Sequence, residues 1–256
     1  MLRQVRPNSK WLWFATGKHP AAGDYFRVGG DFPMAKSLAK WMTAGYSSVS
    51  SQGFSVSALK AWRFWASGPS RGQICGGILR DSSDKFGRPY PLLMAGTGPL
   101  QGWEEAWDLV PMVLEKSWQK MERLATRSFG QLQEVEDELL GFSPPSPEWA
   151  RCRAERDEII LNKTAMSGGG QTALEELKSR HVPPARETEL IIPVNETLQL
   201  DPTAVLSHWQ MVLKGDKDGT TPNAVFLGGL QEKSFLVFFR RALVPGDFHK
   251  LWSLKP

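Results

Sequence analysis

Two short segments of this 256-residue chain place basic, acidic and hydroxyl side chains beside glycines, directly after short apolar runs. The first segment spans residues 17–27 and the second spans residues 81–92. Because glycine permits backbone conformations that other residues resist, such segments are rarely plain surface loops. Their side chains could bind an anion, hold a cation, activate a serine or pair with one another. The candidates for a partner- or ligand-binding site are Lys18, Asp24 and Arg27 in the first segment and Ser82, Asp84 and Arg88 in the second.

The first segment has two interpretations. Glycines that free backbone amides, with Lys18 reaching an anion, would favour phosphate binding. A P-loop, however, needs four residues between its first glycine and Gly-Lys-Ser/Thr, and that spacing is absent here. The alternative is a turn that Asp24 caps, with an ion pair from Asp24 to Arg27 or to Lys18. We expect the turn.

The second segment also suggests two kinds of chemistry. Ser82 could act as a nucleophile, but it would need a base within hydrogen-bond reach, and only His19 could be brought near by the fold. The chain has no Gly-x-Ser-x-Gly elbow. The Asp-Ser-Ser-Asp run could hold a divalent cation, but a calcium loop needs more oxygen ligands at alternating positions. We expect instead a tight loop fixed by Gly87 and by an Asp84–Arg88 ion pair.

The cysteines and histidines do not form a metal-binding pattern. Cys75 and Cys152 are the two cysteines, and neither has a close cysteine or histidine partner in the sequence. The four histidines are scattered along the chain. So few cysteines argue against a disulfide framework and suit a reducing compartment. We therefore predict no catalytic residue, no cofactor and no bound metal.

At these segments the chain resembles the TagF family, also called ImpM, of accessory proteins of bacterial type VI secretion. The family's first motif is Gly-Lys-x-Pro-x-x-Gly-Asp-Phe-x-Arg, and here Tyr25 replaces the phenylalanine. A Trp-Arg-Phe triplet follows at residues 62–64. The third motif resembles Pro-Ser-x-Asp-x-x-Gly-Arg-x-Phe-Pro-Leu, but Asp81 replaces the proline, Pro89 follows the arginine and Tyr90 is the aromatic residue. The matching positions are Gly17, Lys18, Pro20, Gly23, Asp24 and Arg27, then Trp62, Arg63 and Phe64, then Ser82, Asp84, Gly87, Arg88, Pro91 and Leu92.

The resemblance implies a regulator rather than an enzyme. Proteins of this family are associated with post-translational repression of the secretion machine, through a forkhead-associated scaffold protein. The resemblance therefore predicts a non-enzymatic cytoplasmic accessory protein that acts by protein–protein interaction on a type VI secretion component, with such a scaffold as the candidate partner. The motifs span residues 17–92, and beyond about Gly141 the likeness is only one of strand pattern.

Composition and charge exclude several other classes of protein. Hydrophobic residues make up 41% of the chain and charged residues 23%, which is typical of a globular protein. The net charge of +4 reflects 31 basic against 27 acidic residues. Since these form no basic stripe, we expect no nucleic-acid partner. No run approaches the ~20 apolar residues of a membrane span, and residues 11–15 are too few for a signal peptide. We expect a cytoplasmic protein without membrane insertion.

The order of elements predicts an α/β protein whose mixed, partly antiparallel sheet is flanked by helices. We expect a single compact domain or two tightly packed lobes. Residues 1–142 would form a TagF-like N-terminal domain, and residues 143–256 would form a C-terminal α/β extension on the same core.

Single residues and short runs predict local features. Residues 167–170 predict a flexible link, Asp201 predicts a helix cap, and Pro111 predicts a kink or a division within one helical stretch. The predicted strands are residues 11–15, 61–67, 73–79, 90–95, 188–194, 223–227 and 234–240, and the predicted helices are residues 33–46, 104–128, 131–140, 148–161, 202–215 and 245–252.

Three functions are open from the residues alone. The first is the regulator described above. The second is a small-ligand or phosphate-binding sensor built on a cleft of Lys18, Arg27 and Arg88, and the third is a hydrolase that uses Ser82 and Asp84. An open pocket lined by the charged side chains would favour the sensor, whereas the same side chains buried as mutual ion pairs would favour the regulator. A serine–histidine contact would be needed for the hydrolase. Because each segment follows a strand of one predicted sheet, we predict that the two segments meet in space.

Overall fold

The structure of the chain is a computed structural model. It describes residues 10–51, 59–166, 188–194, 202–215, 220–230 and 233–254. The link predicted at residues 167–170 and the cap predicted at Asp201 lie outside these residues.

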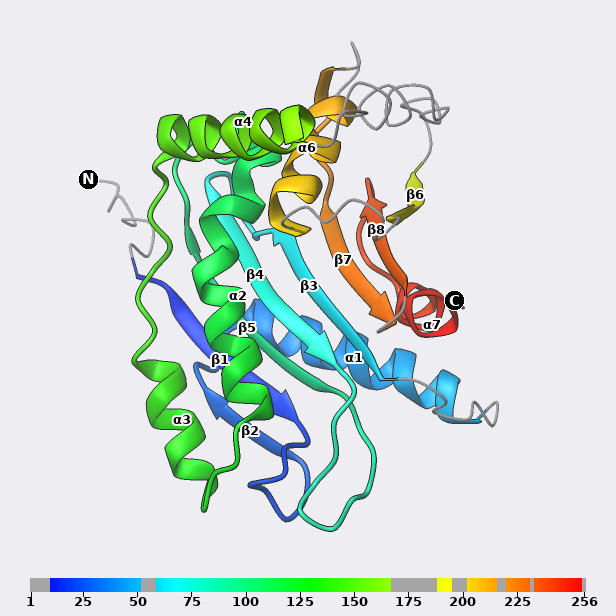
Figure 1. Ribbon diagram of the computed structural model, residues 1–256. Coiled ribbons are helices and arrows are strands. Elements are labelled where there is room, and N and C mark those ends of the chain that lie inside the picture. The colour runs from blue at the N-terminus through cyan, green and yellow to red at the C-terminus, as the bar shows by residue number, and fades with distance from the viewer. Residues whose placement is uncertain are drawn as a thin grey trace, which may run out of the picture.

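One eight-stranded sheet forms the centre of the molecule (Figure 1). Its strand order is β2-β1-β5-β4-β3-β7-β8-β6, and every strand pair among the described residues is antiparallel. The predicted α/β class with a partly antiparallel sheet is therefore confirmed, and the antiparallel pairing extends across the described sheet. The strands are β1 (Leu12–Gly17), β2 (Phe26–Gly29), β3 (Lys60–Ser67), β4 (Gln73–Arg80), β5 (Leu92–Pro99), β6 (Glu189–Val194), β7 (Ala224–Leu230) and β8 (Lys233–Phe239).

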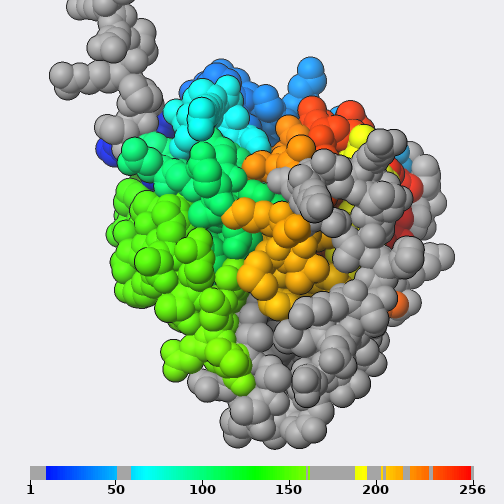
Figure 2. Space-filling view, turned by 90° about the horizontal axis from the view of Figure 1, so that it is seen from above, coloured from blue at the N-terminus to red at the C-terminus, as the bar shows by residue number. Residues whose placement is uncertain are grey.

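Helices cover both faces of this sheet (Figure 1). Because successive side chains of a strand point to opposite faces, neighbours on one strand enter different cores. Phe64 belongs to the core that includes residues of α1 and α7, whereas Trp65 belongs to the core that includes residues of α2, α3 and α6. On this second face, α4 lies beside α6 at the surface (Figure 2). The helices are α1 (Pro33–Ser51) and α7 (Pro245–Ser253) on the first face, and α2 (Val110–Thr126), α3 (Leu132–Leu140), α4 (Trp149–Met166) and α6 (Pro202–Gly215) on the second.

The helical stretch predicted over residues 104–128 is divided, as Pro111 indicates. A short 3₁₀ helix, Trp107–Leu109, comes first, and α2 begins at Val110. Pro111 lies in the first turn of α2, where a backbone N–H would have no partner within the helix. The proline therefore starts a helix instead of kinking one.

The two predicted parts of the chain, residues 1–142 and residues 143–256, both contribute strands to this sheet. β3 pairs with β7, and Phe64 lies opposite Phe226 in that register. The rings of these two residues stack with their centroids 5.4 Å apart. The division at residue 142 stays a prediction, but the strands on its two sides share hydrogen bonds and a core. In the described part of the chain, no helix combines the length and the apolar character that crossing a membrane requires.

Candidate functional site

The two motif segments form loops at the same end of the sheet, at the bottom of Figure 1. We call residues 18–25 and residues 81–91 the motif loops. β1 pairs with β5 so that Gly17 lies opposite Leu92, which brings the start of the first loop beside the end of the second. Gly17 has a φ of +120°, and a Cβ there would lie 2.0 Å from the carbonyl oxygen of Pro91. Only glycine permits this approach.

Asp84 is the centre of the contacts between the motif loops. Its Oδ2 lies 2.7 Å from Nε of Arg88 and 3.0 Å from Nζ of Lys18. Its Oδ1 accepts hydrogen bonds from the backbone N–H groups of Phe86 (3.0 Å) and Arg88 (3.1 Å). Burial opposes ionisation of this fully buried carboxyl, but the bonds from Lys18, the two backbone amides and the Arg88 side chain outweigh it and hold the pKa of Asp84 well below its usual range. The predicted Asp84–Arg88 pair is thus present, and the prediction that the loops meet is confirmed.

Lys18 lies inside the protein, with only 6% of its side chain exposed. Besides Asp84, its ammonium group contacts the backbone carbonyl of Arg88 at 3.4 Å. It also lies 4.8 Å from the centre of the Tyr25 ring. An ammonium group has three donors, and each of these contacts is with a group of the protein itself. Lys18 is therefore a poor candidate for binding an external anion.

Arg88 joins the buried pair to the surface. Its Nη2 donates a hydrogen bond to the backbone carbonyl of Gly23 at 2.7 Å and lies 3.5 Å from Oδ2 of Asp24. Its bond to Asp84, together with the nearby charge of Asp24, raises the pKa of Arg88. Asp24 also accepts a hydrogen bond from the N–H of Tyr25 at 2.8 Å, as expected of a residue that caps a turn. Four of the six predicted site residues, namely Lys18, Asp24, Asp84 and Arg88, thus form one connected network.

The other two candidates lie apart from this network. Arg27 is on β2 and pairs with Asp31 at 2.6 Å, in an exposed contact, instead of pairing with Asp24. Ser82 is half-buried and lines a cavity at the base of the second motif loop. Arg27 therefore does not join Lys18 and Arg88 around a common cleft.

His19 has a structural position that sequence reasoning did not predict. Its side chain is fully buried, Nδ1 accepts a hydrogen bond from the N–H of Ala21 at 3.1 Å, and Nε2 lies 3.1 Å from the carbonyl oxygen of Leu124. Because Nδ1 accepts, Nε2 carries the proton and donates. Burial, above all, lowers the pKa of His19. Both ring nitrogens are engaged with the backbone, so this histidine does not serve Ser82 as a base.

Replacement of His19 by glutamine should weaken the pH dependence of stability. The unfolded chain takes up a proton at this residue near pH 6.5, whereas the folded chain does so only at lower pH. The free energy of unfolding should therefore fall as the pH drops below that value, by at most ~1.4 kcal/mol per pH unit from this group. Urea unfolding of wild type and His19→Gln across this range measures the effect. An equal slope in the two proteins would mean that other groups produce the dependence.

Arg63, in the Trp-Arg-Phe triplet, belongs to a second polar network. Its Nε and Nη2 donate to the two oxygens of Glu122 at 2.6 and 2.9 Å, and its Nη1 donates to Glu115 at 2.9 Å. The guanidinium also lies 5.7 Å from the ring of Trp118. This arginine ties β3 to α2. The two glutamates are seven residues apart, on one face of a helix, and that spacing was the available signal for the contact.

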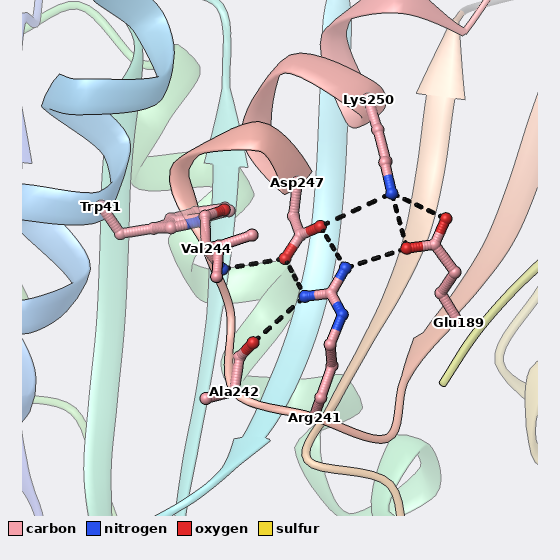
Figure 3. Close-up of polar contacts among 7 residues, drawn as sticks. All are labelled: Trp41, Glu189, Arg241, Ala242, Val244, Asp247 and Lys250. Carbon is pink, nitrogen blue, oxygen red and sulfur yellow. Dashed lines mark hydrogen bonds and ion pairs between the residues drawn. The ribbon is translucent and has the colours of Figure 1, made fainter. Parts of the chain in front are cut away.

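A third charged cluster holds α7 against the far edge of the sheet (Figure 3). Nη1 and Nη2 of Arg241 lie 2.6 and 2.7 Å from the two oxygens of Asp247, which is fully buried. Nη2 also reaches Glu189 at 2.9 Å, and Lys250 contacts the same glutamate at 2.6 Å. Asp247 additionally accepts a hydrogen bond from the N–H of Val244, which completes a capping interaction at the start of α7. Sequence reasoning did not identify this cluster.

Metal-ligating side chains do not gather in the described residues, where no group of three or more His, Cys, Asp or Glu could hold an ion. Cys75 and Cys152 are both buried free thiols. Burial raises the pKa of Cys75 to about 12, so this thiol is protonated and unreactive at neutral pH.

The fold and the site define an α/β protein whose motif loops direct their charged side chains mostly at one another. Residues 14–139 match the family described as the TagF N-terminal domain, type VI secretion system-associated. These residues form a TagF N-terminal domain.

A crystal structure of PA0076 from Pseudomonas aeruginosa PAO1 is similar to part of this chain, with a TM-score of 0.36 and 19% sequence identity. The match covers 52% of this chain and 64% of that one, so this chain spans less than two thirds of that structure. No curated protein matches the chain.

Proposed function

We propose that this chain is a non-enzymatic accessory protein that represses type VI secretion after translation, by binding a cytoplasmic component of the machine. Its association with type VI secretion comes from the TagF N-terminal domain. The observation that supports a non-enzymatic role through protein binding is the buried Lys18–Asp84 pair, whose Nζ–Oδ2 distance is 3.0 Å. Side chains that neutralise one another fix the shape of a loop and leave no charge for catalysis or for a small anion.

The two alternatives have less support. A sensor built on Lys18, Arg27 and Arg88 would need the three cations around one cleft, but Lys18 is enclosed and Arg27 pairs with Asp31. A hydrolase would need a base for Ser82, and both nitrogens of His19 are engaged with the backbone. A preformed surface for a protein partner agrees better with these contacts. We propose a forkhead-associated scaffold protein as that partner, on the basis of the family resemblance.

An excess of this protein should silence type VI-dependent export, because a repressor that sequesters a component acts by mass action. The measurement is export at graded expression levels, with the amount of the scaffold protein determined in parallel. Unchanged export when the protein exceeds the scaffold several-fold would contradict the proposal.

A binding measurement can examine the motif loops through Arg88, which is half-exposed. Arg88→Ala should weaken binding to the purified scaffold by about tenfold or more, as expected for a charged contact at an interface. Arg71→Ala is a matched control, because Arg71 is also an exposed arginine. It lies in the turn before β4, at the end of that strand opposite to the second motif loop. A thermal melt of each variant separates lost binding from lost folding.

A further inference from the structure

A cavity of about 490 Å³ opens at the base of the second motif loop. Its wall combines both motif loops with the end of β4, the C-terminal part of α1 and the last turn of α2. The family motifs account for part of this wall, through Pro20, Ser82 and Gly87. Other lining residues, Arg80 and Tyr46 among them, belong to none of the three motifs. The cavity therefore needs an explanation of its own.

Several of the described residues that line this cavity carry hydrogen-bond donors with no partner in the described part of the chain. Arg80 makes one hydrogen bond within the described residues, from Nε to the carbonyl oxygen of Asp81 at 3.3 Å, which leaves both of its terminal nitrogens free of protein partners there. In the same part of the chain, the hydroxyls of Ser82, Ser83 and Tyr46 have no hydrogen-bond partner, and all three residues line the cavity. A guanidinium beside hydroxyl donors is an arrangement that binds an oxyanion.

The one carboxylate in the wall is already engaged. Oδ1 of Asp81 accepts a hydrogen bond from Nε1 of Trp252, and Oδ2 accepts one from the N–H of Lys60, both at 2.9 Å. The charge of Lys60 acts on this carboxylate as well. Asp81 is thus held by β3 and α7. Its charge also acts on Arg80, but among the described residues its oxygens accept their hydrogen bonds from Trp252 and Lys60 and not from the Arg80 guanidinium.

Apolar groups flank the donors. Leu59 lines the cavity and is 62% exposed. Tyr25, which is 60% exposed, packs edge-on against Tyr90 of the wall, with ring centroids 4.5 Å apart. Exposed aromatic and aliphatic side chains beside an arginine are typical of the centre of a protein interface. The occupant therefore carries apolar side chains next to its anion.

We infer that this cavity binds an acidic side chain, aspartate or glutamate, of an extended partner segment with apolar neighbours. Arg80 grips the carboxylate, Ser82 and Ser83 donate to it, and Leu59 and Tyr25 cover the flanking apolar residues. This inference rests on the proposed function, because it names the chemistry by which the motif loops would recognise a partner.

The charge of the cavity favours a carboxylate over a phosphate. Phosphorylated motifs are recognised by clusters of arginines, since a phosphate carries about −1.5 to −2 charges at neutral pH. Among the described lining residues only Arg80 is basic, and the Asp81 carboxylate lies in the same wall. One guanidinium matches one carboxylate in charge and in bidentate geometry.

Titration of the full-length chain with capped tripeptides tests the inference. The probes are acetyl-Leu-Glu-Leu-amide, its Gln analogue and its phosphoserine analogue, and the readout is the NMR signal of the Arg80 Nε–H. Loss of that signal in Arg80→Gln identifies it. The Glu peptide should shift the signal with millimolar affinity, and the Gln peptide should bind about tenfold more weakly or worse, because it lacks the charged contact. Arg80→Lys and the Ser82→Ala, Ser83→Ala double variant should also weaken binding, whereas Arg71→Gln should not.

The peptide titrations test the inference without reference to the export assay. Tighter binding of the phosphoserine peptide would identify a phosphate site and overturn it, as would equal binding of the Glu and Gln peptides or no binding of any. If the Glu peptide binds at Arg80 while excess protein leaves export unchanged, the proposed function fails and the acidic-segment site stands.

Discussion

Replacement of Lys18 by methionine should lower the free energy of unfolding by about 2–4 kcal/mol, somewhat less than the cost of leaving a buried charge with no partner, because Asp84 keeps Arg88. The side chain of Lys18 is enclosed, and its Nζ lies 3.0 Å from the fully buried carboxylate of Asp84. Methionine fills a similar volume but removes the charge, so the carboxylate keeps Arg88 and its backbone donors but loses its buried cation. Urea unfolding at neutral pH measures the effect.

Two comparisons make this prediction specific. Arg27→Met removes one side of an exposed pair in the same motif, so it should change stability by about 0–1 kcal/mol. Adding Asp84→Asn to Lys18→Met should destabilise less than the sum of the two single changes, because the residues interact directly. A loss for Lys18→Met no larger than that for Arg27→Met would contradict the role assigned to the buried pair.

The same pair should also respond to acid. Its hydrogen bonds hold the pKa of Asp84 below the ordinary value of 3.8. The stabilisation is therefore present above that pH, and it is lost as the pH falls toward the pKa of the folded state. Lys18→Met should accordingly differ less from wild type in strong acid than at neutral pH.

Replacement of Arg241 by methionine should lower the free energy of unfolding by about 2–3 kcal/mol, somewhat less than for Lys18 because Arg241 is partly exposed. The two terminal nitrogens of Arg241 contact both oxygens of buried Asp247, at 2.6 and 2.7 Å (Figure 3). These contacts, above all, raise the pKa of Arg241. Without the guanidinium, the carboxylate at the start of α7 would stay buried with weaker partners.

The effect should concentrate on α7, whose Phe248 and Trp252 fill the core beneath α1. Amide hydrogen exchange in α7 should therefore accelerate in Arg241→Met more than exchange in α2. Lys250→Met is the matched control, because Lys250 shares the Glu189 partner but is 44% exposed. This variant should change stability by only about 0–1 kcal/mol. Uniform acceleration across the chain would indicate global destabilisation instead of release of α7.

The sequence predicted the elements of the fold better than their arrangement. The sequence predicted a helix over residues 33–46 and strands over residues 61–67 and 73–79, and the structure confirms them as α1, β3 and β4. β2 was missed because it is only four residues long and begins within a motif rich in glycine and charge. The strand order was not predicted, since pairings such as β3 with β7 depend on contacts between residues more than 150 positions apart.

In the candidate site, the sequence by itself determined the local geometry: a glycine-anchored loop closed by an Asp84–Arg88 pair four residues apart. Tertiary structure decided which charge met which across the chain. It placed Lys18 on Asp84, left Arg27 with Asp31, and turned His19 into a buried link to α2. The physical reason is that short-range spacing fixes pairs within a loop. Pairing of β1 with β5 is what brings the two motif loops together, so that Lys18 contacts Arg88 across 70 positions of the chain.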